Sequence, residues 1–199
     1  MMAVEFEDDW QWRMLRSRAR GKMESSVSED QVPVIRTYVE MNAREGLRPG
    51  REVPGLEFVR LIGGEEQVKS LHDEVGGPYD WSPLAWPVEK WREQLANPQF
   101  GIFALCADGA DAGFLFLATR PGNVVEICLF GLRPQYVGRG VGGHALTLAC
   151  EAAWGFQPVG NAPAVKVILD TCTKDHPHAL ANYLARGFVV TRTEIDKKH

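Results

Sequence analysis

At 199 residues the chain is long enough for one domain with a full hydrophobic core and too short for two comfortable ones. Hydrophobic residues make up 45% of it and charged residues 24%, ordinary globular proportions that exclude a disordered or fibrous protein. A net charge of -4 argues against a general nucleic-acid binder, and no apolar run approaches the length that spans a membrane.

The four cysteines lie far apart and form no Cys-x-x-Cys pair. Three of them fall inside apolar runs, so we expect buried free thiols in a reducing compartment. The N-terminus lacks the apolar core of a secretory signal, which with the cysteines predicts a cytoplasmic protein. We interpret residues 1–28, dense in charge, as an N-terminal extension and residues 29–199 as a single domain.

The first regular elements follow this extension. Residues 32–41 have the alternating, β-branched character of a strand, whereas residues 42–55 are broken by Gly and Pro and predict a loop. A second strand is expected over residues 56–62 and a short amphipathic helix over residues 64–75. Another helix is expected over residues 88–96, with a proline near its first turn.

Between these two helices lies a loop rich in Pro, Gly and aromatic residues. Loops of this kind often line binding sites, and its candidate residues are Tyr79, Asp80, Trp81 and Trp86. The alternative is that its tryptophans only cover the core.

Three apolar strands come next, joined by the turn sequences Asp-Gly-Ala-Asp and Arg-Pro-Gly-Asn. They are expected over residues 102–107, 112–119 and 124–132. Because these runs are apolar on both faces, helices should cover both sides of the sheet.

A glycine-rich turn and the most apolar helix of the chain, residues 141–154, follow the third strand. A helix with so narrow a polar stripe must lie against a sheet, and it begins directly after bare backbone amides. Such an N-terminus is suited to bind an anion. Beyond it, residues 164–170 predict a strand parallel to residues 124–132, residues 178–186 a helix, and residues 188–195 an edge strand.

Three phosphate-binding motifs compete for the glycine turn. Gly138, Gly140 and Gly143 match the dinucleotide pattern Gly-x-Gly-x-x-Gly, but the hairpin-linked strands before them are not those of a doubly wound fold. A Walker loop is excluded because no Gly-Lys-Ser/Thr follows. The third motif fits more of the chain.

Residues 133–146 resemble the acetyl-CoA pyrophosphate motif of the GCN5-related N-acetyltransferases (GNAT superfamily), Gln/Arg-x-x-Gly-x-Gly/Ala. Gly140 and Gly142 take the two small positions, whereas Val137 stands where the family has Gln or Arg. A second motif agrees independently, since the end of the chain resembles the family's signature Ala-x-x-x-Tyr-x-x-x-Gly-Phe. Its residues here are Ala179, Tyr183, Gly187 and Phe188.

The order of elements also resembles that family over residues 56–195, with residues 32–41 as an added N-terminal strand. The resemblance implies a mixed α/β fold, in which a mostly antiparallel sheet splays between two parallel strands and carries helices on both faces. It also implies acetyl-CoA as co-substrate. The residues expected to hold it are Phe130, Leu132, Val137, Gly138, Arg139, Gly140, Val141, Gly142, Gly143 and His176.

Catalysis in such a protein requires a base for the amine and an acid for the departing thiolate. Glu126 is the candidate base, as the only ionisable residue of its strand; the alternative is that it pairs with Arg120. By the family resemblance Tyr183 is the general acid. His176, just before the last helix, could contact CoA or serve as the base. We expect no metal site, because no further ligands converge on the two nearby histidines.

The sequence therefore predicts an acetyl-CoA-dependent N-acetyltransferase acting by direct attack in a ternary complex. Asp80 would attract a cationic amine and the tryptophans would stack on it, which favours a small amine or amino-acid-like acceptor. Neither nucleic acid nor membrane is an expected partner, and a homodimer stays open. A non-catalytic CoA-binding module of the same fold is the alternative function.

Overall fold

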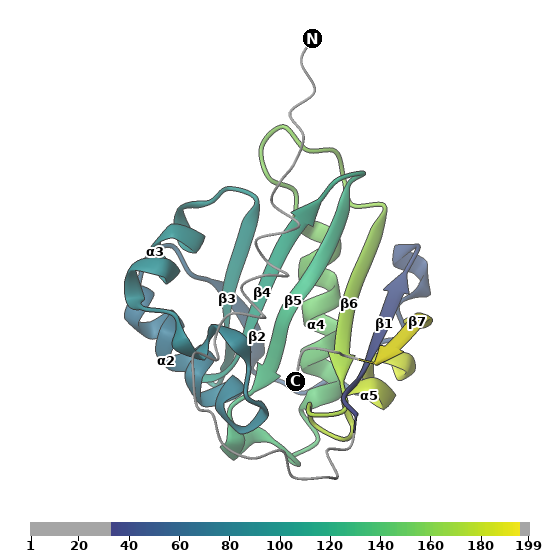
Figure 1. The fold of residues 1–199 in the computed structure, drawn as a ribbon, viewed down its shortest axis with the longest axis horizontal. Helices are drawn as coiled ribbons and strands as arrows, with labels where there is room; N and C mark the ends of the chain where they lie inside the picture. Colours follow the sequence, from purple (N-terminus) through teal and green to yellow (C-terminus); the bar gives the residue numbers. More distant parts are fainter. Residues whose placement is uncertain (1–32, 196–199) are drawn as a thin grey trace.

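Seven strands form one mixed sheet in the order β2-β3-β4-β5-β6-β1-β7 (Figure 1). A computed structural model describes residues 33–195, so the expected extension at residues 1–28 lies outside the described residues. The mixed α/β class is confirmed, and the strands lie within a few residues of their predicted bounds. They are β1 Ile35–Met41, β2 Leu56–Arg60, β3 Phe100–Ala107, β4 Ala110–Arg120, β5 Val124–Leu132, β6 Lys166–Cys172 and β7 Val189–Ile195.

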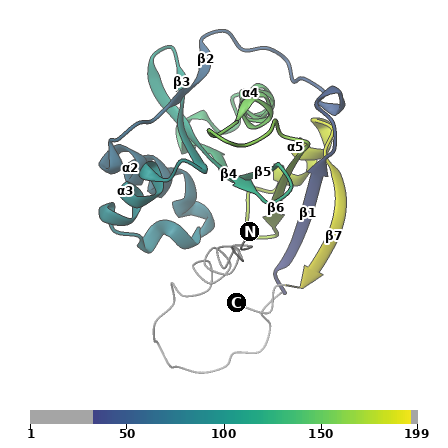
Figure 2. The ribbon, with the colours of Figure 1, turned by 90° about the horizontal axis from the view of Figure 1, so that it is seen from above.

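Helices cover both faces of this sheet, as its apolar strands predicted (Figures 1 and 2). Helices α2 (Glu65–Gly76) and α3 (Val88–Ala96) lie on one face, and α4 (Gly142–Gly155) and α5 (Ala179–Ala185) on the other. The side chains of β4 alternate between the two cores: Phe116 packs with the α2–α3 core and Leu117 with the α4 core. No helix within residues 33–195 combines the length and the apolar character needed to cross a bilayer.

The parallel pairing of β5 with β6 is confirmed, and every other pair of neighbouring described strands is antiparallel. Helix α4 makes the crossover between the two parallel strands. This crossover places the end of β5, the start of α4 and the end of β6 at the same edge of the sheet.

The strand expected as an N-terminal addition lies inside the sheet. β1 pairs antiparallel with both β6 and β7, so it separates them. Val39 and Met41 on one side of β1 are buried in the core beneath α4, which explains its alternating pattern. β7 is the edge strand, as predicted, and all of its residues are exposed.

The connections are largely the loops that Gly and Pro predicted. The aromatic loop contains two short 3₁₀ helices, η2 (Gly77–Tyr79) and η3 (Ser82–Ala85), which the sequence did not predict. Two more, η1 (Arg44–Gly46) and η4 (Pro134–Tyr136), lie elsewhere. Gly187 ends α5 at a φ of 100°, and a Cβ there would lie 2.0 Å from a backbone oxygen, so only glycine fits.

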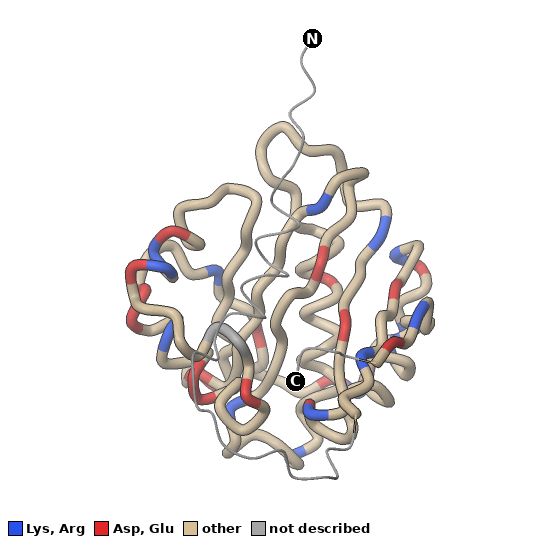
Figure 3. Tube along the Cα trace, in the orientation of Figure 1, with Lys and Arg blue, Asp and Glu red and all other residues tan. Residues whose placement is uncertain are grey.

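Charged residues of both signs are interspersed over the helices and outer strands (Figure 3). In the view of Figure 3 the described residues do not gather into one basic face. This distribution agrees with the small net charge of -4.

Candidate functional site

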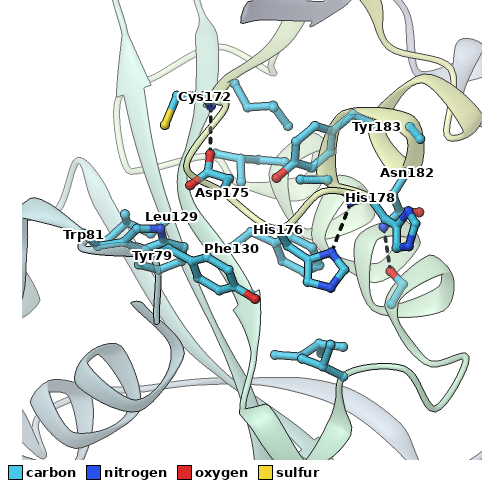
Figure 4. Close-up of a pocket in the computed structure, with 18 of the residues that line it drawn as sticks. Tyr79, Trp81, Leu129, Phe130, Cys172, Asp175, His176, His178, Asn182 and Tyr183 are labelled. Carbon is cyan, nitrogen blue, oxygen red and sulfur yellow. Dashed lines mark hydrogen bonds between the residues drawn. The ribbon is translucent and has the colours of Figure 1, made fainter. Parts of the chain in front are cut away.

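A cavity of about 790 Å³ opens where β5 and β6 separate (Figure 4). Pairing between these strands ends at Glu126 and Ile168. Two residues further along β5, Cys128 is the extra residue of a β-bulge against β4. A bulge bends its strand and increases the local twist, so β5 leaves the direction of β6 at this point. The splay therefore follows from one inserted residue.

The glycine turn forms one end of the cavity. Gly138 and Gly140 adopt φ angles of 76° and 78°, the left-handed region that glycine enters without strain. Within residues 33–195, no group accepts a hydrogen bond from the backbone N–H groups of residues 138–144. The first such bond of α4 runs from Ala145 to the oxygen of Val141 at 2.9 Å. Seven consecutive N–H groups are thus available to an anion at the positive end of α4.

Side chains beside this turn fix its position. Asn182 of α5 donates from Nδ2 to the carbonyl oxygen of Gly142 at 3.1 Å. Thr147, one turn into α4, donates to the oxygen of Gly143 at 3.0 Å and accepts from the backbone of Gly50 at 2.9 Å. The loop before β2 and helix α5 therefore hold the turn from two sides. The carbonyl groups of Gly142 and Gly143 are thereby bound within the protein, and the glycines of the turn line the cavity.

Tyr183 lies on α5 and faces the cavity, where Figure 4 shows its hydroxyl pointing toward Asp175. Its side chain is only 9% exposed. Burial, with added repulsion from Asp175 and Asp170, raises the pKa of the phenol well above its usual range. The hydroxyl therefore stays protonated at neutral pH and can act as a proton donor.

Asp175, on the β6–α5 loop, lines the cavity beside Tyr183. Its Oδ2 accepts from the Thr171 hydroxyl at 2.6 Å and from the backbone N–H of Cys172 at 2.9 Å. Its Oδ1 makes no hydrogen bond with any residue that the structure describes. One oxygen is thus anchored while the other remains available.

His176 also lines the cavity, with its ring 6.3 Å from that of Tyr79. Its Nδ1 accepts a hydrogen bond from the backbone N–H of His178 at 3.2 Å. The neutral ring must then carry its proton on Nε2. In this geometry His176 is a hydrogen-bond donor and lacks the free nitrogen lone pair of a base.

Opposite charges meet near the end of β6. Arg36, from the inserted strand β1, forms an ion pair with Asp170, and both residues line the cavity. Their side chains are 20% and 11% exposed. Lys174 lines the same region. The N-terminal strand thus contributes a cation to the cavity wall.

The aromatic loop forms the opposite wall. Tyr79, Asp80 and Trp81 line the cavity, as predicted from their loop. Trp81 packs so closely on Gly76 that a Cβ there would lie 2.6 Å from its ring. Asp80 adopts a left-handed conformation with a φ of 56°, which directs the chain from η2 toward η3.

Two predicted site residues do not line this cavity. Trp86 is 7% exposed and packs on Trp91, with ring centroids 5.0 Å apart, because its side chain completes the α2–α3 core. Glu126 forms an ion pair with Arg120 at 2.6 Å, and their side chains are about equally buried. The structure places Trp86 in the core and not at the cavity, and it shows Glu126 in the pairing with Arg120 that was the alternative to a base.

Most of the residues proposed for the co-substrate do meet at the cavity. They are Phe130, Leu132, Val137, Gly138, Gly140, Gly142, Gly143 and His176, together with the proposed acid Tyr183. Arg139 and Val141 do not line it. Sequence reasoning missed other lining residues, namely Arg36, Asp170, Asp175 and Asn182. Only Asn182 carried a signal, because it directly precedes the signature tyrosine.

The geometry can be compared with known proteins. The family model described as the acetyltransferase (GNAT) family matches residues 68–188. A GCN5-related N-acetyltransferase from Kribbella flavida is 15% identical with a TM-score of 0.58, covering 81% of this chain and 58% of that chain. One from Sphaerobacter thermophilus is 14% identical with a TM-score of 0.56, covering 83% of this chain and 51% of that chain.

A tandem GNAT protein from the clavulanic acid biosynthesis pathway is 14% identical with a TM-score of 0.54, covering 83% of this chain and 53% of that one. The chain therefore spans between about half and three fifths of these structures. At such identities the likeness concerns the fold. No curated protein matches the chain.

Proposed function

The chain belongs to the acetyltransferase (GNAT) family, whose model covers more than half of it, and we propose that it transfers an acetyl group from acetyl-CoA to a small amine. The amine would attack the thioester directly while both substrates are bound. This chain has an added N-terminal strand in its sheet, and the similar structures are longer than it is. The acceptor is therefore inferred from the residues that line the cavity.

The row of unpaired N–H groups at residues 138–144 carries this proposal. A diphosphate is an anion that such a row at a helix N-terminus can bind without a charged side chain. Val137 is therefore compatible with the function, although it stands where the family has Gln or Arg. Arg139 is exposed at the mouth of the turn and would add screened positive charge.

The remainder of the co-substrate fits the edge of β5. Beyond Glu126 this edge has no strand partner among the described residues, so its backbone groups face the cavity. The amides of a pantetheine arm could pair with the backbone of Phe130 and Leu132 in the manner of an added strand. This direction would bring the thioester toward Tyr183 and away from the glycine turn.

Tyr183 is proposed to donate its proton to the departing thiolate. Burial raises the pKa of its phenol, so the group holds a proton throughout the physiological range and is present in the donor form when the thiolate departs. The N–H at Nε2 of His176 is suited to polarise a carbonyl oxygen in the same cavity.

The acceptor is proposed to be a small cationic amine or an amino-acid-like molecule. Asp80 and Asp175 supply negative charge at the cavity, and Tyr79 and Trp81 supply aromatic faces. Arg36 and Lys174 line the cavity near the end of β6 and would suit a carboxylate on the same molecule. The four free cysteines support a reducing compartment such as the cytoplasm.

A thiol-release assay tests this function directly. Purified protein, acetyl-CoA and a panel of alkylamines and amino acids should liberate CoA, measured with DTNB, and calorimetry should show acetyl-CoA binding. The absence of both thiol release above buffer and binding would overturn the proposal.

A non-catalytic CoA-binding module is the second candidate. It is favoured by the pairing of Glu126 with Arg120, which removes the base expected from the sequence. Binding of acetyl-CoA without transfer to any amine, and without any effect of Tyr183→Phe, would establish it.

A further inference from the structure

The carboxylates near the cavity differ in their partners. Glu126 is bound to Arg120 outside the lining, and Asp170 is bound to Arg36 within it. Such pairing stabilises the ionised form and makes a carboxylate a poorer proton acceptor. Asp175 lines the cavity and forms no ion pair with any described residue. Asp80 lies on the aromatic wall, whereas Asp175 lies beside the proposed acid Tyr183.

The anchoring of Asp175 leaves it correctly oriented for proton transfer. The Thr171 hydroxyl and the Cys172 amide both bind Oδ2, so the carboxylate plane is fixed by two hydrogen bonds from the end of β6. Oδ1 is then the oxygen open to another partner. The Asp175 charge also acts on Tyr183 and Tyr79, and it raises the pKa of both phenols. Asp175 therefore lies between the proposed acid and the wall assigned to the acceptor.

We propose that Asp175 is the general base for the amine. This inference rests on the proposed acetyl transfer and assigns the base to Asp175 in place of Glu126. His176 is excluded from the role because its Nδ1 is occupied by the His178 amide.

The proton movements balance in this arrangement. Oδ1 of Asp175 takes one proton from the ammonium, and the nitrogen lone pair forms the C–N bond with the thioester carbonyl carbon. When the C–S bond breaks, its electron pair leaves with sulfur, and Tyr183 gives its proton to the thiolate.

Asp175 then releases its proton to solvent, from which the Tyr183 phenolate regains one, and the freed carboxylate accepts the second proton from nitrogen as the amide forms. That proton leaves to solvent. One ammonium and one thioester give one amide, one thiol and one proton, and both side chains return to their initial state.

Several other titratable or charged groups line the cavity with Asp175. They come from its own loop, from β1 and β6, from the aromatic loop and from α5. They are Arg36, Tyr79, Asp80, Asp170, Cys172, Lys174, His176, His178 and Tyr183. Cations and anions both occur among them. The pH profile of each variant is therefore compared with that of the unaltered protein, and no single inflection is assigned to one side chain.

The test is Asp175→Asn in the full chain. An asparagine oxygen can still accept from Thr171 and Cys172, so the anchoring is kept while the basicity is lost. With an alkylamine acceptor, kcat/KM should fall at least about 100-fold. With a weakly basic acceptor such as an alkoxyamine, largely uncharged at pH 7, the loss should be less than about fivefold because no proton needs removing before attack.

The pH dependence separates this role from a structural one. For Asp175→Asn with the alkylamine, kcat/KM should rise about tenfold per pH unit below the amine pKa, following the fraction of free base. Asp111→Asn is the matched control, since this half-buried carboxylate binds Gln67 outside the cavity and its loss should leave the rates with both acceptors unaffected. An equal decrease in kcat/KM with both acceptors, or no decrease with either, would overturn the inference.

Two measurements keep the outcomes distinct. If the unaltered protein transfers no acetyl group, the proposed function itself fails. If the unaltered protein is active and Asp175→Asn has the same kcat/KM, only the role of Asp175 fails. Should the Asn variant not fold, Asp175→Ala with added formate is the second test. Formate should then restore activity in proportion to its concentration, and a folded Ala variant without such restoration would also contradict the inference.

Discussion

The two ends of the cavity are built from different parts of the chain. The glycine end presents backbone N–H groups of residues 138–144, and its nearest charged side chain on the turn, Arg139, lies outside the lining. The Tyr183 end presents a phenol, a carboxylate and an ion pair, all from side chains. One end therefore depends on backbone conformation and the other on the identity of single residues.

This difference predicts how each end responds to substitution. A side-chain change at the glycine end should alter binding only when it changes the backbone, because the anion-binding groups belong to the peptide itself. A change at the Tyr183 end removes a reacting group and should lower the rate without much effect on affinity. The experiments below separate kcat from the Kd of acetyl-CoA for this reason.

The largest effect is expected for Tyr183→Phe. Removing the hydroxyl takes away the proton donor and keeps the ring that packs against Phe188. We expect kcat to fall about 100-fold while the Kd of acetyl-CoA and the melting temperature change little. Steady-state kinetics, calorimetry and thermal melting measure the three quantities.

Tyr38→Phe is the matched control, because its hydroxyl binds Glu194 on the far edge of the sheet and its loss should leave kcat unchanged. The pH profile adds a second check. Since burial raises the pKa of the Tyr183 phenol, its deprotonation should produce no fall in activity up to about pH 10. An alkaline fall below that pH which vanishes in Tyr183→Phe would contradict the assignment.

The next effect is expected at Gly140, on the backbone-built end. A Cβ at Gly140 meets nothing within 4 Å, so Gly140→Ala adds only the strain of a φ of 78°. That strain is worth about 1–2 kcal/mol. If the turn relaxes to relieve it, binding must restore the strained form, and the Kd of acetyl-CoA should weaken about tenfold. The value of kcat at saturation should stay unchanged.

Gly63→Ala provides the same strain away from the cavity. Gly63 has a φ of 87°, and a Cβ there also meets nothing within 4 Å. This variant should be destabilised by a similar amount and bind acetyl-CoA normally. Equal Kd values for the two variants would remove the distinction between the ends of the cavity.

The backbone-built end was also the more predictable one. Glycine spacing and helix polarity locate N–H groups directly, because they follow from local conformation at Gly138 and Gly140. Tyr183 was located differently, by its resemblance to the family's C-terminal signature. The fold was predictable because apolar runs and turn residues mark each strand and helix, and even the parallel pairing followed from one crossover.

The rest of the side-chain end was not predictable, because it depends on contacts between distant segments. Arg36 reaches the cavity only because β1 lies between β6 and β7, and no local sequence pattern specifies that position of the strand. Asp175 acquires its role from anchoring by Thr171 and from the neighbouring tyrosine. Glu126 was chosen as the sole ionisable residue of its strand, and the partner that neutralises it lies on β4.

A smaller effect is expected for Glu126→Gln. The carboxylate and Arg120 are 15% and 16% exposed, so breaking the pair leaves a mostly buried cation without its partner. We expect a loss of about 1 kcal/mol in the free energy of unfolding, or about 2–4 °C in melting temperature. Because neither residue lines the cavity, kcat/KM should change less than about threefold.

Arg120→Gln should reproduce this loss of stability, and the double variant should lose less than the sum of the two because the pair couples them. The measurement that decides the role of Glu126 is the acceptor panel. A large decrease in kcat with alkylamines alone would return the base to Glu126 and remove it from Asp175.

The smallest effect is expected for Val137→Gln, which places a family-like residue in the glycine turn. Val137 has a φ of -68°, a value that any residue adopts, so the exchange leaves the backbone conformation in place. The N–H groups of the turn are then unchanged, and one neutral amide adds at most one solvent-exposed hydrogen bond to a bound diphosphate. The Kd of acetyl-CoA should decrease by less than about threefold.

Val137→Ala should likewise change this Kd little, since the backbone and not this side chain binds the anion. A loss of tenfold in either variant would show that a side chain is needed here after all, and the two ends of the cavity would then follow the same rule.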